Sequence, residues 1–231
     1  MANTNDRIRV WDVPVRLFHW VLVILMVTSY FTGRAGGDWM KIHFWSGYTI
    51  LTLLLFRIAW GFVGSTTARF SHFVKGPSAA FHHLAELVGA DRPRDVGHNP
   101  LGGAMVMVLI FAVLAQVIAG LFAADTDMGT VNGPLTKLVS DKFIEQATAF
   151  HVFWINVLLA LAGLHVLAAI VYLVWKRQNL IGAMIHGSKP INDCVPPGQP
   201  APQLQFASIR LAISLLIACA AIVYFIVRLG S

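Results

Sequence analysis

The stretch His151-Val-Phe-Trp-Ile-Asn-Val-Leu-Leu-Ala-Leu-Ala-Gly-Leu-His165 places two histidines inside one long apolar run, about residues 147–175. Such a run can cross a bilayer, which takes about 20 mostly apolar residues. The histidines are fourteen positions apart, so on an α-helix both rings point to the same side, about 40° short of four turns. At a rise of about 1.5 Å per residue they lie roughly 21 Å apart along the axis. The stretch therefore predicts a transmembrane helix with one histidine near each membrane face.

Four more apolar runs predict further spans, at about residues 17–33, 42–63, 101–124 and 211–227. The polar stretch 64–100 is predicted to form a surface helix on its apolar residues Phe70, Phe73, Phe81 and Leu84. The proline-rich stretch 187–202 is predicted to be an irregular loop. The chain is thus expected to be an all-α membrane protein.

Composition supports lipid as the main solvent. The chain is 57% hydrophobic and only 12% charged, against about 25% charged in soluble domains. A net charge of +6 is modest, so nucleic-acid binding is not expected. The two cysteines, Cys194 and Cys219, form no C-x-x-C-H pattern, which excludes a covalently attached c-type haem.

Lysine and arginine set the predicted orientation. With a cytoplasmic N-terminus, eleven of them lie inside and five outside, with Arg57 within the second span. Five spans then leave the C-terminus outside. We therefore expect a multi-pass protein of a bacterial inner membrane, with a cytoplasmic N-terminus, a periplasmic C-terminus and an acidic outer loop that contains Asp125 and Asp127.

Four histidines fall in or at the ends of spans, and the orientation sorts them by depth. His19 and His165 lie on the cytoplasmic side and form the predicted inner pair; His43 and His151 lie on the periplasmic side and form the predicted outer pair. Two axial histidines complete a six-coordinate haem iron suited to electron transfer. The pairing predicts a four-helix bundle that holds two b haems, with a fifth C-terminal helix.

Other interpretations of intramembrane histidines fit less well. A single such histidine is often a hydrogen-bonded interior residue, but four that pair by depth are harder to explain in that way. A proton relay calls for Asp or Glu within the spans, and a di-iron bundle calls for Glu-x-x-His pairs. Neither pattern is present in the five runs.

Two more residues are predicted to serve the haems. Arg57 is fourteen positions after His43, so it shares the face of that histidine but lies at the depth of the inner pair. We expect its guanidinium to bind a haem propionate; the alternative is that it extends to the inner lipid headgroups. Gly47, one turn after His43, is expected to give the flat cofactor room to approach.

Spaced motifs in the chain resemble those of the bacterial cytochrome b561 family, which includes the b-type cytochrome subunits of nickel–iron hydrogenases. They are Val10-Trp-Asp-Val-Pro-Val-Arg-Leu-Phe-His19-Trp, His43-x-x-x-Gly47, Gly97-His-Asn-Pro-Leu-Gly-Gly103, His151, His165 and Asn179-Leu-Ile-x-Ala-Met184-x-x-Gly187. The resemblance covers about residues 7–190 and implies a four-helix di-haem core with the same histidine pairing. It also implies exchange of electrons with membrane quinone. The fifth span departs from the family pattern, so residues 1–190 are assigned to the core and 191–231 to a loop and an added helix.

Three functions are compatible with these features. The first is an electron-transfer subunit, without catalytic residues of its own, that connects quinone with a periplasmic c-type cytochrome or hydrogenase-like partner. The second is a stand-alone superoxide:quinone oxidoreductase. The third is a structural or assembly subunit of a larger respiratory or photosynthetic complex. The partner, the direction of electron flow, the quinone site and the oligomeric state are left open.

Overall fold

The computed structural model describes residues 7–88, 94–124, 131–196 and 198–230 of the 231-residue chain. Within helix α4 it does not describe the side chains of residues 84–88. Two predictions therefore fall outside the described residues. They are the place of the Leu84 side chain on a surface helix and the place of Asp125 and Asp127 in an outer loop.

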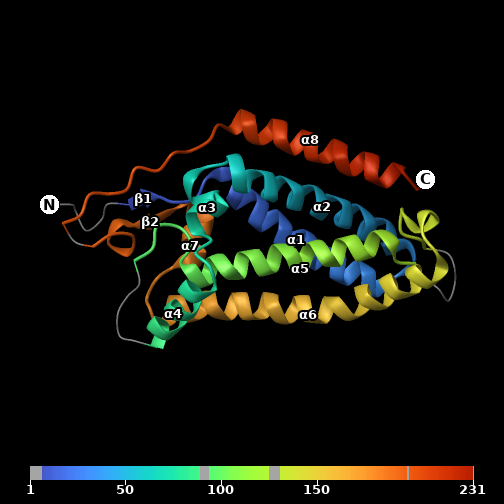
Figure 1. The fold of residues 1–231 in the computed structure, drawn as a ribbon, viewed down its shortest axis with the longest axis horizontal. Helices are drawn as coiled ribbons and strands as arrows, with labels where there is room; N and C mark the ends of the chain where they lie inside the picture. The colour runs from blue at the N-terminus through green and yellow to red at the C-terminus, as the bar shows by residue number, and fades with distance from the viewer. Residues whose placement is uncertain (1–6, 89–93, 125–130, 197, 231) are drawn as a thin grey trace. The chain divides into compact units, whose positions relative to one another are not determined.

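Five long apolar helices dominate the described residues (Figure 1). They are α1 (Val13–Ala35), α2 (Met40–Val63), α5 (Pro100–Phe122), α6 (Asp141–Val174) and α8 (Ile209–Arg228). All five are long and apolar enough to cross a membrane. A helix suits lipid because it satisfies its backbone hydrogen bonds internally. The predicted all-helical membrane fold with five spans is confirmed.

A tight turn joins the first two long helices. Gly36 and Gly37 have φ of 64° and 54°, a left-handed conformation that costs glycine little. The short 3₁₀ helix η1 (Gly37–Trp39) follows and leads into α2. Helix α2 begins at Met40, so His43 lies in its first turn.

The chain groups into two compact units. Unit 1 contains residues 1–17, 58–108 and 163–212, and unit 2 contains residues 18–57, 109–162 and 213–231. These units are made of discontinuous segments, whereas the predicted division runs along the sequence, with a core of residues 1–190 and a C-terminal segment of residues 191–231. That division stays a prediction.

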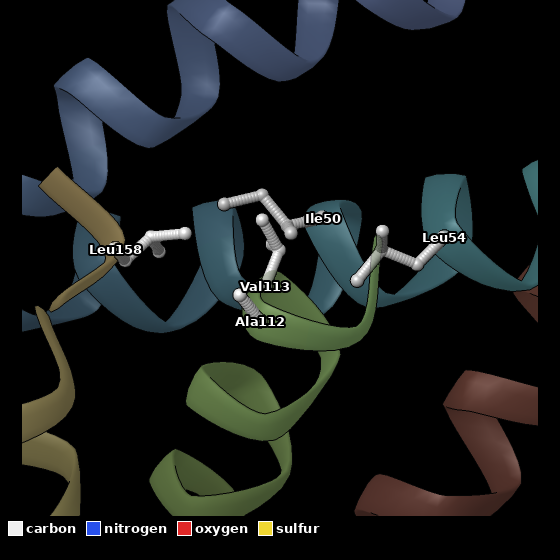
Figure 2. Close-up of a cluster of buried hydrophobic side chains, with 5 residues drawn as sticks. All are labelled: Ile50, Leu54, Ala112, Val113 and Leu158. Carbon is white, nitrogen blue, oxygen red and sulfur yellow. The ribbon is translucent and has the colours of Figure 1, made fainter. Parts of the chain in front are cut away.

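In unit 2, helices α2, α5 and α6 share a buried apolar cluster (Figure 2). Its members are Ile50, Leu54, Ala112, Val113 and Leu158. A second cluster joins Leu51 of α2 and Leu121 of α5 to Val223 of α8, so α8 packs on this unit. In lipid such contacts stabilise through close van der Waals packing.

In unit 1, a two-stranded antiparallel ribbon ties the N-terminal segment to the segment after α6. Strand β1 (Arg7–Arg9) pairs with β2 (Ser188–Pro190). The backbone N–H groups of Val10 and Trp11 both donate to the carbonyl of Gly187, at 2.8 and 3.0 Å. The prediction of an irregular loop over 187–202 was therefore wrong at its start, where β2 and the 3₁₀ helix η4 (Ile191–Asp193) form. The partner of β2 is far away in the sequence, so local composition could not reveal the pairing.

The same unit contains three short helices, α3 (Phe70–Phe73), α4 (Pro77–Val88) and α7 (Leu180–His186). The predicted helix within 64–100 is thus two helices, and its aromatic residues do not share one environment, since Phe73 is buried and Phe81 is 73% exposed. His83 of α4 is buried. Its Nε2 lies 2.8 Å from the hydroxyl of Tyr172, which also accepts a hydrogen bond from Asn99.

Candidate haem site

Two of the four predicted ligands meet within unit 2. His43, near the start of α2, and His151, in the first half of α6, place their ring centroids 6.1 Å apart with an interplanar angle of 88°. Both side chains are half-buried. The sequence paired these residues by depth alone, and the structure brings their rings to one place.

Backbone carbonyls orient both rings. Nδ1 of His43 lies 2.8 Å from the carbonyl oxygen of Ser29, and Nδ1 of His151 lies 2.9 Å from that of Gln116. A carbonyl oxygen only accepts hydrogen bonds, so each Nδ1 carries the proton and donates it. Each Nε2 is then left with a lone pair, which is the form of histidine that binds a metal.

The side chain of Gln116 agrees with this tautomer. Its amide nitrogen donates to the carbonyl oxygen of His151 at 3.1 Å and lies 3.4 Å from Nε2 of the same residue. An amide N–H that points at Nε2 needs an unprotonated nitrogen there. The carbonyl oxygen Oε1 of Gln116 is buried and has no hydrogen-bond partner among the described residues.

The spacing of the outer pair fits a haem iron held between two histidines. A metal–nitrogen bond is about 2 Å long, and a ring nitrogen lies about 1 Å from its ring centroid. An iron with one such bond on each side therefore separates the centroids by about 6 Å, which matches the separation found. Among the described residues, no third His, Cys, Asp or Glu completes a group that could hold a bare metal ion. Two histidine ligands would suit an iron whose other ligands come from a porphyrin.

Open space lies beside Gly47, the glycine that is predicted to leave room for the cofactor. A Cβ placed on Gly47 would meet no heavy atom within 4 Å, and the same is true of Gly163 on α6. The predicted role of Gly47, to leave room for a flat ring, is compatible with this space.

The inner pair is split between the two units. His19, on α1, belongs to unit 2 and His165, on α6, belongs to unit 1. Each is half-buried. The ring of His19 lies edge-on to that of Trp20, with centroids 4.9 Å apart. Their pairing around one haem stays a prediction.

Arg57 lies in the last third of α2 and is almost fully buried, with 2% of its surface exposed. An arginine that extended toward lipid headgroups would have an exposed side chain. Burial within the protein therefore favours an internal anion as its partner. The predicted bond to a haem propionate remains a prediction.

Four residues beside the outer pair were not predicted from the sequence: Ser29, Gly33, Gln116 and Gly120. A Cβ on Gly33 would lie 2.8 Å from Nδ1 of His43, and a Cβ on Gly120 would lie 2.8 Å from Cε1 of His151. Gln116 was detectable as an amide in an apolar run. The glycines gave no separate signal, because small residues also serve ordinary helix packing in membranes.

Among curated proteins, this chain is similar to a probable Ni/Fe-hydrogenase B-type cytochrome subunit of Bradyrhizobium diazoefficiens, with 25% identity over 83% of this chain and 90% of the relative. A protein of the same name from Azotobacter vinelandii is 29% identical over 83% of this chain and 92% of its own length. A probable Ni/Fe-hydrogenase 1 B-type cytochrome subunit of Escherichia coli strain K12 is 31% identical over 48% of this chain and 57% of the relative.

No solved structure matches the chain. The sequence profile described as prokaryotic cytochrome b561 matches residues 10–187, which contain α1 to α7 and all four histidines of the two predicted pairs. This match covers well over half of the sequence. The chain therefore belongs to the prokaryotic cytochrome b561 family.

Proposed function

We propose that this protein transfers electrons across the membrane between quinone and a periplasmic redox partner, either a c-type cytochrome or a hydrogenase-like subunit. The family implies membrane electron transfer and typically binds b haems. The observation that carries the proposal for this chain is the outer pair, with ring centroids 6.1 Å apart and both Nδ1 atoms bonded to backbone carbonyls. The proposal includes two b haems, one held by His43 and His151 and the other by His19 and His165.

The haem, when bound, supplies reversible one-electron chemistry at its iron. The chain's own residues hold and orient it. His43 and His151 would hold the haem as its two histidine ligands, which would leave no position for a small ligand and would suit electron transfer rather than oxygen chemistry. The carbonyls of Ser29 and Gln116 keep both rings in the tautomer that binds a metal. Arg57, buried in α2, is proposed to bind a propionate.

A partner subunit is supported by the relatives, whose names describe B-type cytochrome subunits of Ni/Fe hydrogenases. We extend this only to a class of partner, a redox protein on the periplasmic side. The proposal places the N-terminus in the cytoplasm and the C-terminus in the periplasm of a bacterial inner membrane, because most lysine and arginine residues then face inward.

Residues 191–231 are proposed to be an addition to the core of residues 1–190. The family profile ends at residue 187. Helix α8 nevertheless contacts the core through Val223, which is buried with Leu51 and Leu121. The opposite face of α8 is exposed and apolar, including Ile217 and Phe225, which suits lipid as its neighbour.

Purification of the chain in detergent tests the proposal. We expect two non-covalent b haems per chain, low-spin spectra in both redox states, and reduction of both haems by a short-chain quinol. The variant His43→Ala should keep one haem and serves as the matched control. One haem or none in the wild-type protein, or haem that resists extraction with acid acetone, would contradict the proposal.

Affinity purification from native membranes then distinguishes the possible contexts. Co-purification of a periplasmic haem protein or hydrogenase, together with quinol-driven reduction of that partner, supports the electron-transfer subunit. Quinone reduction by the isolated chain with superoxide as donor would instead favour a stand-alone oxidoreductase.

A further inference from the structure

The two histidines of the outer pair are held in the same way by two different helices. His43 of α2 donates from Nδ1 to the carbonyl of Ser29, on α1. His151 of α6 donates from Nδ1 to the carbonyl of Gln116, on α5. In each case the carbonyl belongs to the long helix that comes before the histidine's own helix in the chain.

A glycine follows each accepting carbonyl at the same distance along the helix. Gly33 comes four residues after Ser29, and Gly120 comes four residues after Gln116. In an α-helix the carbonyl of residue i accepts the N–H of residue i+4, so both carbonyls already have one partner within their own helix. The histidine N–H must therefore approach the second lone pair from the side.

The residue at i+4 decides whether that approach is possible. A helical side chain leans toward the N-terminus and covers the turn before its own Cα, which is where the carbonyl of residue i lies. A Cβ on Gly33 would lie 2.8 Å from Nδ1 and 2.9 Å from Cε1 of His43. A Cβ on Gly120 would lie 2.8 Å from Cε1 and 3.1 Å from Nδ1 of His151. Any other residue at these positions would push the ring away from the carbonyl.

We propose that Gly33 and Gly120 are positioning residues of the outer haem site, which uncover the carbonyls of Ser29 and Gln116 so that His43 and His151 are fixed with Nδ1 protonated and Nε2 turned to the iron. This inference rests on the proposed function for its haem, but the contacts it uses are all made by the chain's own residues. Gly47 has a different role, because a Cβ there would meet nothing within 4 Å.

The arrangement has a consequence for the redox potential. A hydrogen bond from Nδ1 to a carbonyl makes the imidazole a stronger base, which favours ferric over ferrous iron and lowers the potential of the haem. Loss of such a partner typically weakens metal binding by about 10- to 100-fold. Gly33→Ala and Gly120→Ala should each raise the potential of the outer haem and weaken its binding by roughly tenfold or more. The inner haem should be unchanged.

Ser29→Ala provides the matched control. The hydroxyl of Ser29 lies 3.2 Å from Nδ1 of His43, close to the backbone carbonyl at 2.8 Å. Removing the hydroxyl leaves the carbonyl and Gly33 in place. If the uncovered carbonyl is what holds the ring, Ser29→Ala should leave the potential of the outer haem nearly unchanged while Gly33→Ala shifts it.

Nitrogen NMR of histidine-labelled protein tests the inference without haem. In the haem-free wild-type protein, His43 and His151 should both show protonated Nδ1 and unprotonated Nε2, with signals assigned by substituting each histidine with Gln. In Gly33→Ala, only His43 should lose this preference, and in Gly120→Ala only His151. These spectra remain informative even if the chain proves not to bind haem as proposed.

The outcomes separate cleanly. A wild-type protein with protonated Nε2 on both rings would overturn the inference, as would alanine variants that keep both the tautomer and the potential of the outer haem. If the variants lose the outer haem but retain the inner one, and the histidine beside the new methyl group changes tautomer, the inference holds. If one alanine variant does not fold, the other variant and the wild-type spectrum still test the inference.

Discussion

Asp12 offers the sharpest test of how the N-terminal motif is built. Its carboxylate is buried, and one oxygen accepts the backbone N–H of Val15 at 2.8 Å, which caps helix α1. The other oxygen accepts the indole N–H of Trp60 at 2.9 Å, and Trp60 is fully buried. The substitution Asp12→Ala removes both bonds at once, two helical turns before His19.

The expected loss of stability follows from these two contacts. Loss of a helix cap costs about 1 kcal/mol, and a buried N–H left without an acceptor costs about 1–3 kcal/mol. Asp12→Ala should therefore reduce the free energy of unfolding by about 2–4 kcal/mol. Trp60→Phe removes the indole donor and leaves the cap. The two substitutions should be coupled by about 1–2 kcal/mol in a double-mutant cycle, since they delete the same hydrogen bond.

Reversible unfolding in mixed detergent micelles measures these values. The control is Val13→Ala, next to Asp12 and 41% exposed, which should change stability by no more than about 0.5 kcal/mol. Additive effects of Asp12→Ala and Trp60→Phe, within about 0.3 kcal/mol, would refute the assignment of a shared buried hydrogen bond.

Four further predictions concern the haems, the orientation and a buried thiol. Replacing either His43 or His151 with alanine should remove the outer haem and half of the reduced-minus-oxidised difference spectrum, and replacing either His19 or His165 should remove the inner haem and the other half. Loss of the same spectral component from a variant of each pair would contradict the pairing. Arg57→Leu should lower the potential of the inner haem by roughly 60 mV, a tenfold change for one electron, whereas Arg57→Lys should retain most of it; a redox titration that finds both haems unchanged would exclude Arg57 as a propionate partner. Alkaline phosphatase fused after the last residue should be active in the periplasm, and green fluorescence from a fusion at that site would instead indicate a cytoplasmic C-terminus. Burial raises the pKa of the Cys194 thiol despite the neighbouring Lys189. In the folded protein, alkylation of Cys194 at pH 8 should therefore be at least about tenfold slower than that of a free cysteine, and unfolding should remove this difference. Equal alkylation rates in the folded and unfolded states would show that the thiol is accessible.

Much of the fold was predictable because lipid limits the choices. A backbone in hydrocarbon must satisfy its own hydrogen bonds, so a long apolar run has one outcome. The five predicted spans correspond to α1, α2, α5, α6 and α8 with small differences at their ends. Helix α6 begins at Asp141, several residues before the apolar run, because a carboxylate in the first turn is favourable at a helix N-terminus.

The parts that were not predictable depend on contacts between distant residues. Strand β2 exists because β1, about 180 positions earlier, pairs with it. The burial of His83 depends on Tyr172, a residue on another helix. Neither follows from local composition, which reports only what each segment would prefer by itself.

For the outer pair, the sequence predicted the depth of the two histidines in the membrane but not the orientation of their rings. His43 and His151 could be paired from the sequence, because the rise of a helix and the orientation of the spans determine depth without tertiary information. Their orientation needed more, since a ring can bind a metal only if something else takes its second nitrogen. The acceptors, the carbonyls of Ser29 and Gln116, are backbone atoms that every residue has, so no side chain marks them. What distinguishes these carbonyls is the glycine four residues later, Gly33 or Gly120. The role of each glycine becomes visible only in the structure, where the histidine ring from a neighbouring helix occupies the space that a Cβ would take.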